Sequence, residues 1–340
     1  MATAALDQKT SLSIFERMLM MRHFEEAAIR LYNEKQFVSH YHIYIGQEAT
    51  GAGVLEALGE KDLICTTHRN HGHIIGRGCD PGRAFAEILG RATGFNGGRG
   101  GTLHICDPER GFLSTSAIVG GCAPLATGAA YGIKTKHEPH VAVGFFGDGS
   151  LEEGIVLEAF NIAALWRLPV VYVCENNSAG AIGAQQGGYS AATTAVESFI
   201  SLPAAYGIDA IKVDGADAAA VHAAARDAVA RCRAGQGPVF IEAVTVRWPG
   251  SSPLWPVLAT TFDLSQAFDP ARIDGPHADW VRRHDPLLRL ARDIVGRKFA
   301  TPAQLEARDQ AARERIEAAI AFAIESPMPT PETAFADVFA

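Results

Sequence analysis

Two short polar segments in the middle of the chain have the residue types of a metal and phosphate site. Gly-Asp-Gly-Ser occupies residues 147–150 and Asn-Asn occupies residues 176–177, each directly or closely after an apolar run. Asp148 offers a carboxylate oxygen and Asn177 an amide oxygen, the hard ligands that Mg²⁺ binds together with phosphate oxygens and water. Glycine lets the backbone approach a diphosphate closely, and a helix beginning after Ser150 would point its N-terminus at the anion.

The spacing of these segments decides between two interpretations. Taken alone, a Gly-Asp-Gly segment is more often an ordinary turn, and an Asn-Asn segment is more often a helix cap or part of a loop. However, 26 residues lie between Gly149 and Asn176, which is room for one helix and one strand. This spacing places both segments at the carboxyl ends of neighbouring parallel strands, where open α/β sheets bind ligands. Together the two segments predict a metal–diphosphate site.

The surrounding sequence alternates between strand-like and helix-like segments. Short apolar runs predict strands at 141–146, 170–174, 210–213 and 239–246. Helical spacing of apolar residues predicts helices at 11–34, 47–58, 151–168, 218–233 and 301–325. Such alternation is typical of an α/β fold with a parallel sheet and helices packed on both faces.

We expect three parts along the chain. Residues 1–40 form an N-terminal helical arm, residues 41–248 the α/β domain with both polar segments, and residues 249–340 a loop and a C-terminal helical arm. The last part begins with a proline-rich stretch, 249–286. Loops of that length in compact proteins are usually functional or disordered, and we expect this one to be ordered.

Composition excludes several classes of protein. The net charge of −8 argues against nucleic-acid binding, which needs a basic face. No window has the roughly 18 apolar residues of a membrane span, and the N-terminus lacks the pattern of a secretory signal. The six cysteines form no C-x-x-C pair, so neither a zinc site nor a disulfide framework is predicted. We therefore expect reduced thiols and a cytoplasmic protein.

Residues 147–177 resemble the thiamine diphosphate motif of the alpha subunits of pyruvate, branched-chain 2-oxo acid and acetoin dehydrogenases. The resemblance extends from about Phe15 to Phe339 and includes the segments 42–49, 68–73 and 97–104. His-Arg-Asn-His-Gly-His at 68–73 is most similar to acetoin dehydrogenase alpha chains. The resemblance implies a thiamine diphosphate-binding fold with thiamine diphosphate and Mg²⁺ as cofactors.

The resemblance also implies site residues. The Mg²⁺ ligands are Asp148, Asn177 and the carbonyl group of Ala179. The residues expected to bind thiamine diphosphate, with His68 standing where relatives often have tyrosine and Ala117 where they have glycine, are His68, Arg69, Ala117, Val119, Gly147, Gly149, Ser150 and Arg247. His42 and His71 are the expected catalytic residues, although a core hydrogen bond would also account for either histidine.

The implied activity is decarboxylation of a small 2-oxo acid and transfer of the resulting acyl or hydroxyalkyl unit. The implied assembly is an α₂β₂ heterotetramer in which the beta subunit supplies a glutamate to the cofactor, with a lipoyl-bearing acyltransferase as a further partner. Ser251 stands where relatives have a histidine. An alternative is therefore a carboligase that passes its two-carbon unit to an aldehyde or ketone without lipoyl transfer, and a third is a non-catalytic assembly subunit.

Overall fold

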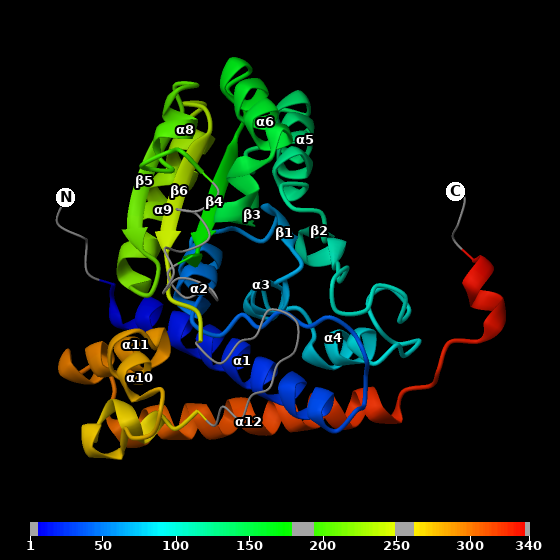
Figure 1. The fold of residues 1–340 in the computed structure, drawn as a ribbon, viewed down its shortest axis with the longest axis vertical. Helices are drawn as coiled ribbons and strands as arrows, with labels where there is room; N and C mark the ends of the chain where they lie inside the picture. The colour runs from blue at the N-terminus through cyan, green and yellow to red at the C-terminus, as the bar shows by residue number, and fades with distance from the viewer. Residues whose placement is uncertain (1–5, 179–193, 249–261, 337–340) are drawn as a thin grey trace.

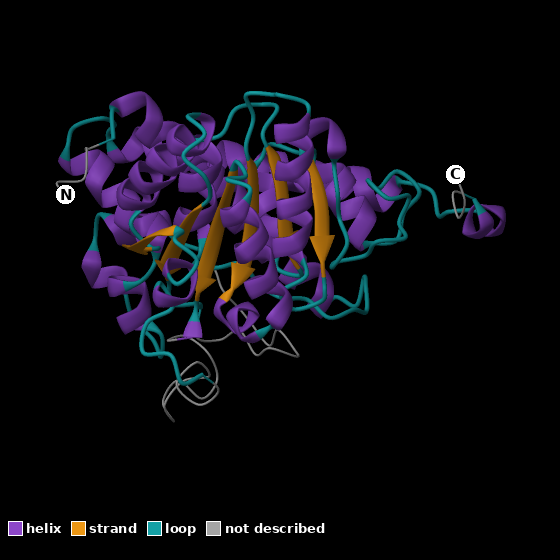
Figure 2. Ribbon diagram, turned by 90° about the horizontal axis from the view of Figure 1, so that it is seen from above, coloured by secondary structure: helices purple, strands orange, loops and turns teal. Residues whose placement is uncertain are grey.

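The computed structural model describes residues 6–178, 194–248 and 262–336. Its centre is a six-stranded parallel sheet with the strand order β2-β1-β3-β4-β6-β5. The strands are β1 (Leu63–Thr67), β2 (Phe112–Ser116), β3 (Ala142–Gly147), β4 (Val170–Asn176), β5 (Asp209–Asp214) and β6 (Val239–Val244). Figures 1 and 2 show helices on both faces of this sheet, which confirms the predicted α/β fold.

The helices differ widely in length, from the four residues of α8 to the 26 residues of α1. The α-helices are α1 (Gln8–Asn33), α2 (Glu48–Glu56), α3 (His71–Gly76), α4 (Pro81–Ile88), α5 (Cys122–Thr135), α6 (Gly154–Leu165), α8 (Ser201–Ala204), α9 (Ala218–Arg233), α10 (Ala278–Arg283), α11 (Pro286–Gly296) and α12 (Pro302–Glu325). The 3₁₀ turns are η1 (Pro108–Arg110), η2 (Asp148–Glu152), η5 (Leu264–Ala267), η6 (Pro270–Arg272) and η7 (Pro331–Phe335). In the described ranges, no helix has the length and apolar character that a bilayer crossing requires.

The central strands are buried on both faces, which explains why they are continuous apolar runs in the sequence. Along β4, Val171 and Val173 belong to the core on one face of the sheet, whereas Val170, Tyr172 and Cys174 belong to the core on the other. Side chains alternate between the faces of a strand, so a strand covered by helices on both sides needs apolar residues throughout.

The two helical arms pack on the same face of the sheet. Residues of α1, α12, α2 and α9 share one core with the strands. Thr301 caps α12 in a capping box with Gln304, and Pro302 occupies the first turn, as is typical of a helix start. The segment that carries η7 projects from the body of the fold (Figure 1), and Arg99 Nη1 donates to its Ala336 carbonyl at 3.0 Å. The division into three parts stays a prediction, although its parts contribute to one core.

Several details differ from the sequence-based expectations. The helix predicted at 151–168 is two elements, the turn η2 followed by α6, so the helix begins at Gly154 rather than directly after Ser150. The proline-rich stretch 249–286 contains η5, η6 and α10 in its described part. The edge strand β2 and strand β1 were not predicted from the sequence. The segment Phe-Leu-Ser-Thr-Ser of β2 has exposed positions and no apolar run.

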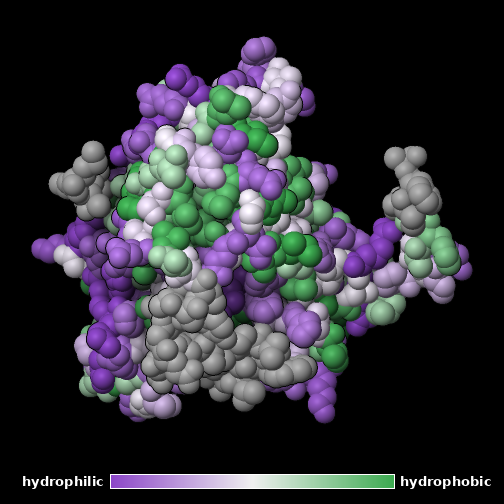
Figure 3. Space-filling view, turned by 45° about the horizontal axis from the view of Figure 1, so that its top comes forward, coloured by the Kyte–Doolittle hydropathy of each residue, from purple (hydrophilic) through white to green (hydrophobic). Residues whose placement is uncertain are grey.

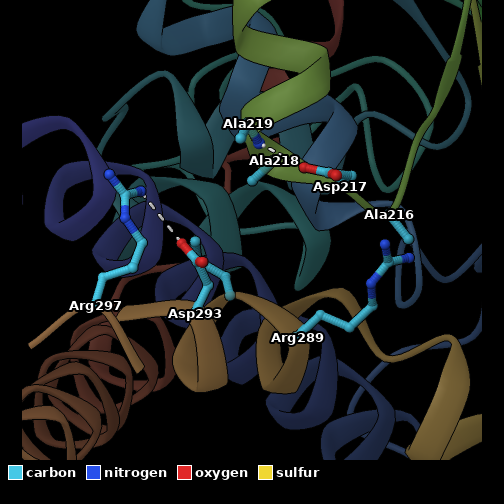
Figure 4. Close-up of a pocket in the computed structure, with 8 residues that line it drawn as sticks. Ala216, Asp217, Ala218, Ala219, Arg289, Asp293 and Arg297 are labelled. Atoms are coloured by element: carbon cyan, nitrogen blue, oxygen red, sulfur yellow. Dashed lines mark hydrogen bonds and ion pairs between the residues drawn. The ribbon is translucent and has the colours of Figure 1, made fainter. Parts of the chain in front are cut away.

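A cavity of about 320 Å³ lies between the N-terminal end of α9 and α11 (Figure 4). Every charged side chain that lines it already has a partner. Asp217 caps α9 by accepting from the backbone N–H groups of Ala219 and Ala220. Arg297 pairs with Asp293, and Arg289 pairs with Asp214 at 2.8 Å. These pairs account for the charges around the cavity, and we assign it a structural role.

Candidate functional site

A second cavity, of about 190 Å³, lies at the carboxyl ends of the strands. With the exception of Gln47, each lining residue lies within three residues of the end of β1, β2, β3 or β4. The lining residues are Gln47, Thr67, His68, Arg69, Ile118, Val119, Gly147, Asp148, Gly149, Ser150, Glu175 and Asn177. The sheet therefore brings together side chains from four separate stretches of sequence at the edge where such folds bind ligands.

Most of the predicted site residues meet in this cavity. It is lined by the predicted metal ligands Asp148 and Asn177 and by six of the eight predicted cofactor-binding residues, which are His68, Arg69, Val119, Gly147, Gly149 and Ser150. Neither of the other two, Arg247 and Ala117, is among the lining residues in the described ranges, although Arg247 is buried and close enough to Arg69 to affect its pKa. Ala179, the third predicted metal ligand, lies outside the described residues, as does Ser251.

The structure distinguishes between the two adjacent asparagines. The Asn176 side chain is fully engaged within the protein, because its Nδ2 donates to Glu242 Oε1 at 2.8 Å and its Oδ1 accepts from the Ser178 hydroxyl at 2.8 Å. The Asn177 side chain faces the cavity, and its Nδ2 donates to Gln47 Oε1 at 2.6 Å. Because the oxygen and nitrogen of an amide lie on opposite sides of its carbon, this arrangement turns the Asn177 oxygen away from Gln47.

The two glycines of the motif leave the backbone accessible. A Cβ atom built on Gly147 or on Gly149 would meet no other atom within 4 Å, so the space in front of the chain is open. The Ser150 hydroxyl accepts from the Gly120 backbone N–H at 3.2 Å and thereby ties this turn to the segment after β2. An anionic group can therefore approach the backbone of this turn closely.

One side of the cavity, which we call the cationic wall, is formed by Arg69 with Arg247 close to it. Arg69 is buried, its Nη1 donates to the Ile43 carbonyl, and its pKa is lowered to about 9 by burial and by the nearby guanidinium of Arg247. Arg247 is buried as well. Two buried cations close to each other disfavour their own charged forms, and an anion bound in the cavity next to Arg69 would reverse that effect. The site is thus electrostatically suited to a phosphate group.

Two histidines stand next to this wall. The rings of His42 and His68 pack edge to face, with centroids 4.4 Å apart. Burial lowers the pKa of His42 to about 3, with His68 and Arg69 as further causes. Burial also lowers the pKa of His68 to about 4, helped by Arg69. Both imidazoles are therefore neutral near pH 7, and each offers one donor and one acceptor nitrogen.

His71, which was predicted to be catalytic, does not reach the cavity. It is completely buried, its Nε2 lies 2.9 Å from the Thr102 carbonyl oxygen, and its ring stacks on Tyr41 with centroids 4.5 Å apart. Its Nδ1 lies 3.6 Å from Glu25 Oε1. The geometry therefore favours the alternative role for His71, a hydrogen-bonded core residue beneath the site.

Sequence reasoning missed Gln47, Thr67, Ile118 and Glu175 as cavity residues. Glu175 is nearly fully buried, and its Oε1 accepts from the Tyr44 hydroxyl at 2.5 Å and lies 3.3 Å from His73 Nε2. The sequence carried a signal for Glu175, because it lies two residues before Asn177 near the end of β4. Gln47 belongs to a segment that resembles the family, but nothing in the spacing placed it opposite Asn177.

The sequence of this chain is similar to a known family and to several known proteins. The sequence model of the dehydrogenase E1 component matches residues 16–332. The chain is 34% identical to the alpha subunit of acetoin:2,6-dichlorophenolindophenol oxidoreductase of Cupriavidus necator, over 99% of this chain and 96% of that protein. It is 36% identical to the pyruvate dehydrogenase E1 component subunit alpha of Zymomonas mobilis, over 98% and 89%. It is 41% identical to the acetoin:2,6-dichlorophenolindophenol oxidoreductase alpha subunit of Bacillus subtilis, over 72% of each chain.

These matches confirm the resemblance that the sequence motifs indicated. They cover the strands, the cavity and both helical arms, and they involve named alpha subunits of pyruvate and acetoin enzymes. The chain belongs to the dehydrogenase E1 component family.

Proposed function

We propose that this chain is the alpha subunit of an enzyme that uses thiamine diphosphate and Mg²⁺ to decarboxylate a small 2-oxo acid and to transfer the resulting acyl or hydroxyalkyl unit. The observation that carries the proposal is the single cavity in which Asp148, Asn177, His68 and Arg69 meet. Family membership supports the thiamine diphosphate dependence, because the dehydrogenase E1 component family is generally thiamine diphosphate-dependent.

The residues present fit the cofactor. Asp148 and the Asn177 amide oxygen would hold Mg²⁺, together with phosphate oxygens, water and the Ala179 carbonyl. In the described ranges, no group of three acidic, histidine or cysteine side chains forms an all-protein metal site. That finding agrees with Mg²⁺, which usually keeps only one or two carboxylate ligands and shares its other positions with substrate phosphates and water.

The diphosphate would lie between the open backbone of 147–150 and the cationic wall. Arg69 donates through a planar guanidinium, which suits phosphate oxygens. The carbanion chemistry at the 2-oxo carbon comes from bound thiamine diphosphate. The neutral imidazole of His42, which packs against the cavity residue His68, would accept a proton near the reacting groups and return it as an imidazolium.

Cofactor binding is expected to take up protons. Negative charge from the diphosphate should raise the pKa values of His42 and His68 from about 3 and about 4 toward their ordinary range. Near pH 6 the bound form would therefore carry more protons than the free form, and affinity should fall as the pH rises toward 8. Calorimetry in buffers with different ionisation enthalpies measures this uptake. It should shrink in His68→Gln and stay unchanged in His137→Asn, a change at an exposed histidine.

The partner that we propose is a beta subunit, in an α₂β₂ heterotetramer. The relatives named above are alpha subunits. An apolar surface supports the proposal. Its exposed side chains on and next to α5 and α6 are Leu125, Tyr131, Ile155, Ile162, Leu165 and Trp166. Figure 3 shows apolar surface gathered on the part of the molecule that carries these helices. Large exposed apolar patches usually mark protein interfaces.

This apolar surface is continuous with the candidate site. Ile118 and Val119 line the cavity and are themselves about three-quarters and half exposed, and they lead into α5. A beta subunit seated there would cover the open side of the cavity. A cytoplasmic location is proposed on the basis of the six free cysteines, five of which are buried.

The proposed function is tested by co-expressing this chain with a beta-type chain and measuring release of CO₂ from pyruvate and from other small 2-oxo acids. Turnover that requires both thiamine diphosphate and Mg²⁺ is the expected result. A complex that binds neither cofactor would leave only the non-catalytic assembly subunit as an explanation.

A second candidate, an acyloin-forming carboligase, is favoured by Ser251. A histidine delivers protons near neutral pH, whereas a serine hydroxyl does not, and a positioned acid is worth roughly 10²–10⁴-fold in rate. We therefore expect transfer to a lipoyl-bearing acyltransferase to be slower than transfer to an aldehyde or a diketone. The measurement compares a lipoyl domain with small carbonyl acceptors in one assay. A lipoyl rate equal to or above the carbonyl rate would contradict this candidate, and Ser251→His should raise the lipoyl rate.

A further inference from the structure

We propose that Gln47 is a positioning residue of the metal–diphosphate site: it fixes the Asn177 amide with its oxygen toward the cavity and offers its own Nε2 to an oxygen of the bound diphosphate. This inference rests on the proposed function and adds a residue to its site. Gln47 lies at the start of α2 rather than at the end of a strand, and it lines the cavity opposite Asn177.

The first observation is the contact between the two amide groups. Asn177 Nδ2 donates to Gln47 Oε1 at 2.6 Å. An asparagine amide has donors on one side and an acceptor on the other, and only the acceptor oxygen binds Mg²⁺. A partner that accepts from Nδ2 therefore selects the orientation in which the Asn177 oxygen points toward the metal. Without such a partner the amide could turn its nitrogen toward the metal.

The second observation is an unsatisfied donor. Gln47 is 1% exposed, and its Nε2 is buried without a hydrogen-bond partner in the described part of the chain. A buried donor without a partner is costly, and native structures contain few of them. The same side chain lines the cavity, so an oxygen of an anion bound there would satisfy Nε2. With an anion bound, the two amide groups would form a chain of hydrogen bonds that ends at the ligand.

The third observation is that the backbone at Gln47 is held rigidly. Gly46 has a φ of +101°, and a Cβ at this position would lie 2.7 Å from the Val246 carbonyl oxygen. Two hydrogen bonds reinforce this close approach: Gly46 N–H donates to Glu48 Oε2 at 2.8 Å, and Trp248 N–H donates to the Ile45 carbonyl at 3.1 Å. Gln47 is therefore fixed between the ends of β4 and β6.

The contacts that hold the backbone around Gln47 continue into the N-terminal arm. Arg22 Nε donates to Glu48 Oε1 at 2.6 Å, and Arg22 Nη1 donates to Asp285 Oδ2 at 2.8 Å. These side chains are buried and tie α1, α2 and the start of α11 together. Such a network resists the small displacements that would move the Gln47 amide out of reach of Asn177. A mobile glutamine could not select an orientation for its neighbour.

The test compares Gln47→Met with the unmodified complex of this chain and its beta-type partner. Methionine keeps the length of the side chain but neither accepts nor donates a comparable hydrogen bond. Calorimetry should show thiamine diphosphate binding weakened roughly 10- to 100-fold in the presence of Mg²⁺, the effect of losing a hydrogen bond to a charged group. The Mg²⁺ concentration needed for half-maximal binding should rise as well. Gln236→Leu, at an exposed position, serves as the matched control and should change neither value.

A double-mutant cycle with Asn177→Ala separates positioning from a general structural effect. If Gln47 acts through Asn177, the combined loss should be smaller than the product of the two single losses. If the two single losses of affinity simply multiply in the double variant, or if Gln47→Met binds as tightly as the unmodified complex, this inference is overturned and the proposed function is not. Failure of the unmodified complex to bind thiamine diphosphate would overturn the proposed function together with it. If Gln47→Met does not fold, Gln47→Glu replaces it: the carboxylate keeps the acceptor, lacks the donor and repels the diphosphate, so affinity should fall at least as far.

Discussion

Replacement of Asp148 by alanine is expected to abolish Mg²⁺-dependent binding of thiamine diphosphate while leaving the fold intact. Asp148 is the charged member of the proposed ligand set and follows β3 directly. Residues that merely support a metal ligand typically cost 10–100-fold in metal affinity when they are changed. Loss of a charged ligand should therefore exceed about 100-fold. Calorimetry on the complex with the beta-type chain, with and without Mg²⁺, measures the effect.

Two controls separate the loss of a metal ligand from a general effect of charge or of unfolding. Asp274→Ala removes an exposed aspartate far along the chain and should leave the affinity unchanged. The Tm of Asp148→Ala should stay within a few degrees of the original value, because Asp148 lies at the cavity rather than in the apolar core. Unchanged cofactor affinity in a folded Asp148→Ala variant would show that the metal site has been assigned to the wrong residues.

The sequence predicted the central strands for a clear physical reason. Strands β3, β4 and β6 are covered by helices on both faces and are mostly apolar, so each stands out as an apolar run. The polar exceptions are Glu242 in β6 and Glu175 and Asn176 at the end of β4. The sequence did not predict strands β1 and β2. β2 lies at the edge of the sheet and pairs only with β1, so half of its side chains need not be apolar. Its position becomes evident only when the sheet is assembled.

The candidate site was predictable to the extent that its residues follow strands. Asp148 and Asn177 could be placed side by side because the carboxyl ends of adjacent parallel strands meet at one edge. Gln47 could not be placed in this way, since it begins a helix that reaches the cavity from outside the sheet. The spacing could not place His71 either, and its catalytic role stays a prediction. It lies only two residues after Arg69 in sequence, yet it begins α3 and turns into the core.

The purified chain is expected to have no measurable decarboxylase activity on any 2-oxo acid until a beta-type chain is added. In the proposed enzyme, a glutamate of the beta subunit contacts the N1′ nitrogen of the cofactor. General acid–base groups of this kind contribute roughly 10²–10⁴-fold. The chain alone also leaves its apolar surface on α5 and α6 exposed and the cavity uncovered on that side. A single beta subunit should both supply the missing glutamate and cover the apolar surface and the cavity.

The described part of this chain offers one other carboxylate at the cavity besides Asp148, namely Glu175. Its Oε1 already accepts from the Tyr44 hydroxyl and lies close to His73, so it is held in the wall rather than free to serve the cofactor. The experiment measures CO₂ release by the chain alone, by the beta-type chain alone and by the complex. Substantial turnover by this chain without any co-purified protein would refute the split site. Glu175→Gln would then be the informative variant, because a self-sufficient site would have to use that carboxylate, whereas in the split site its loss should leave the requirement for the partner unchanged.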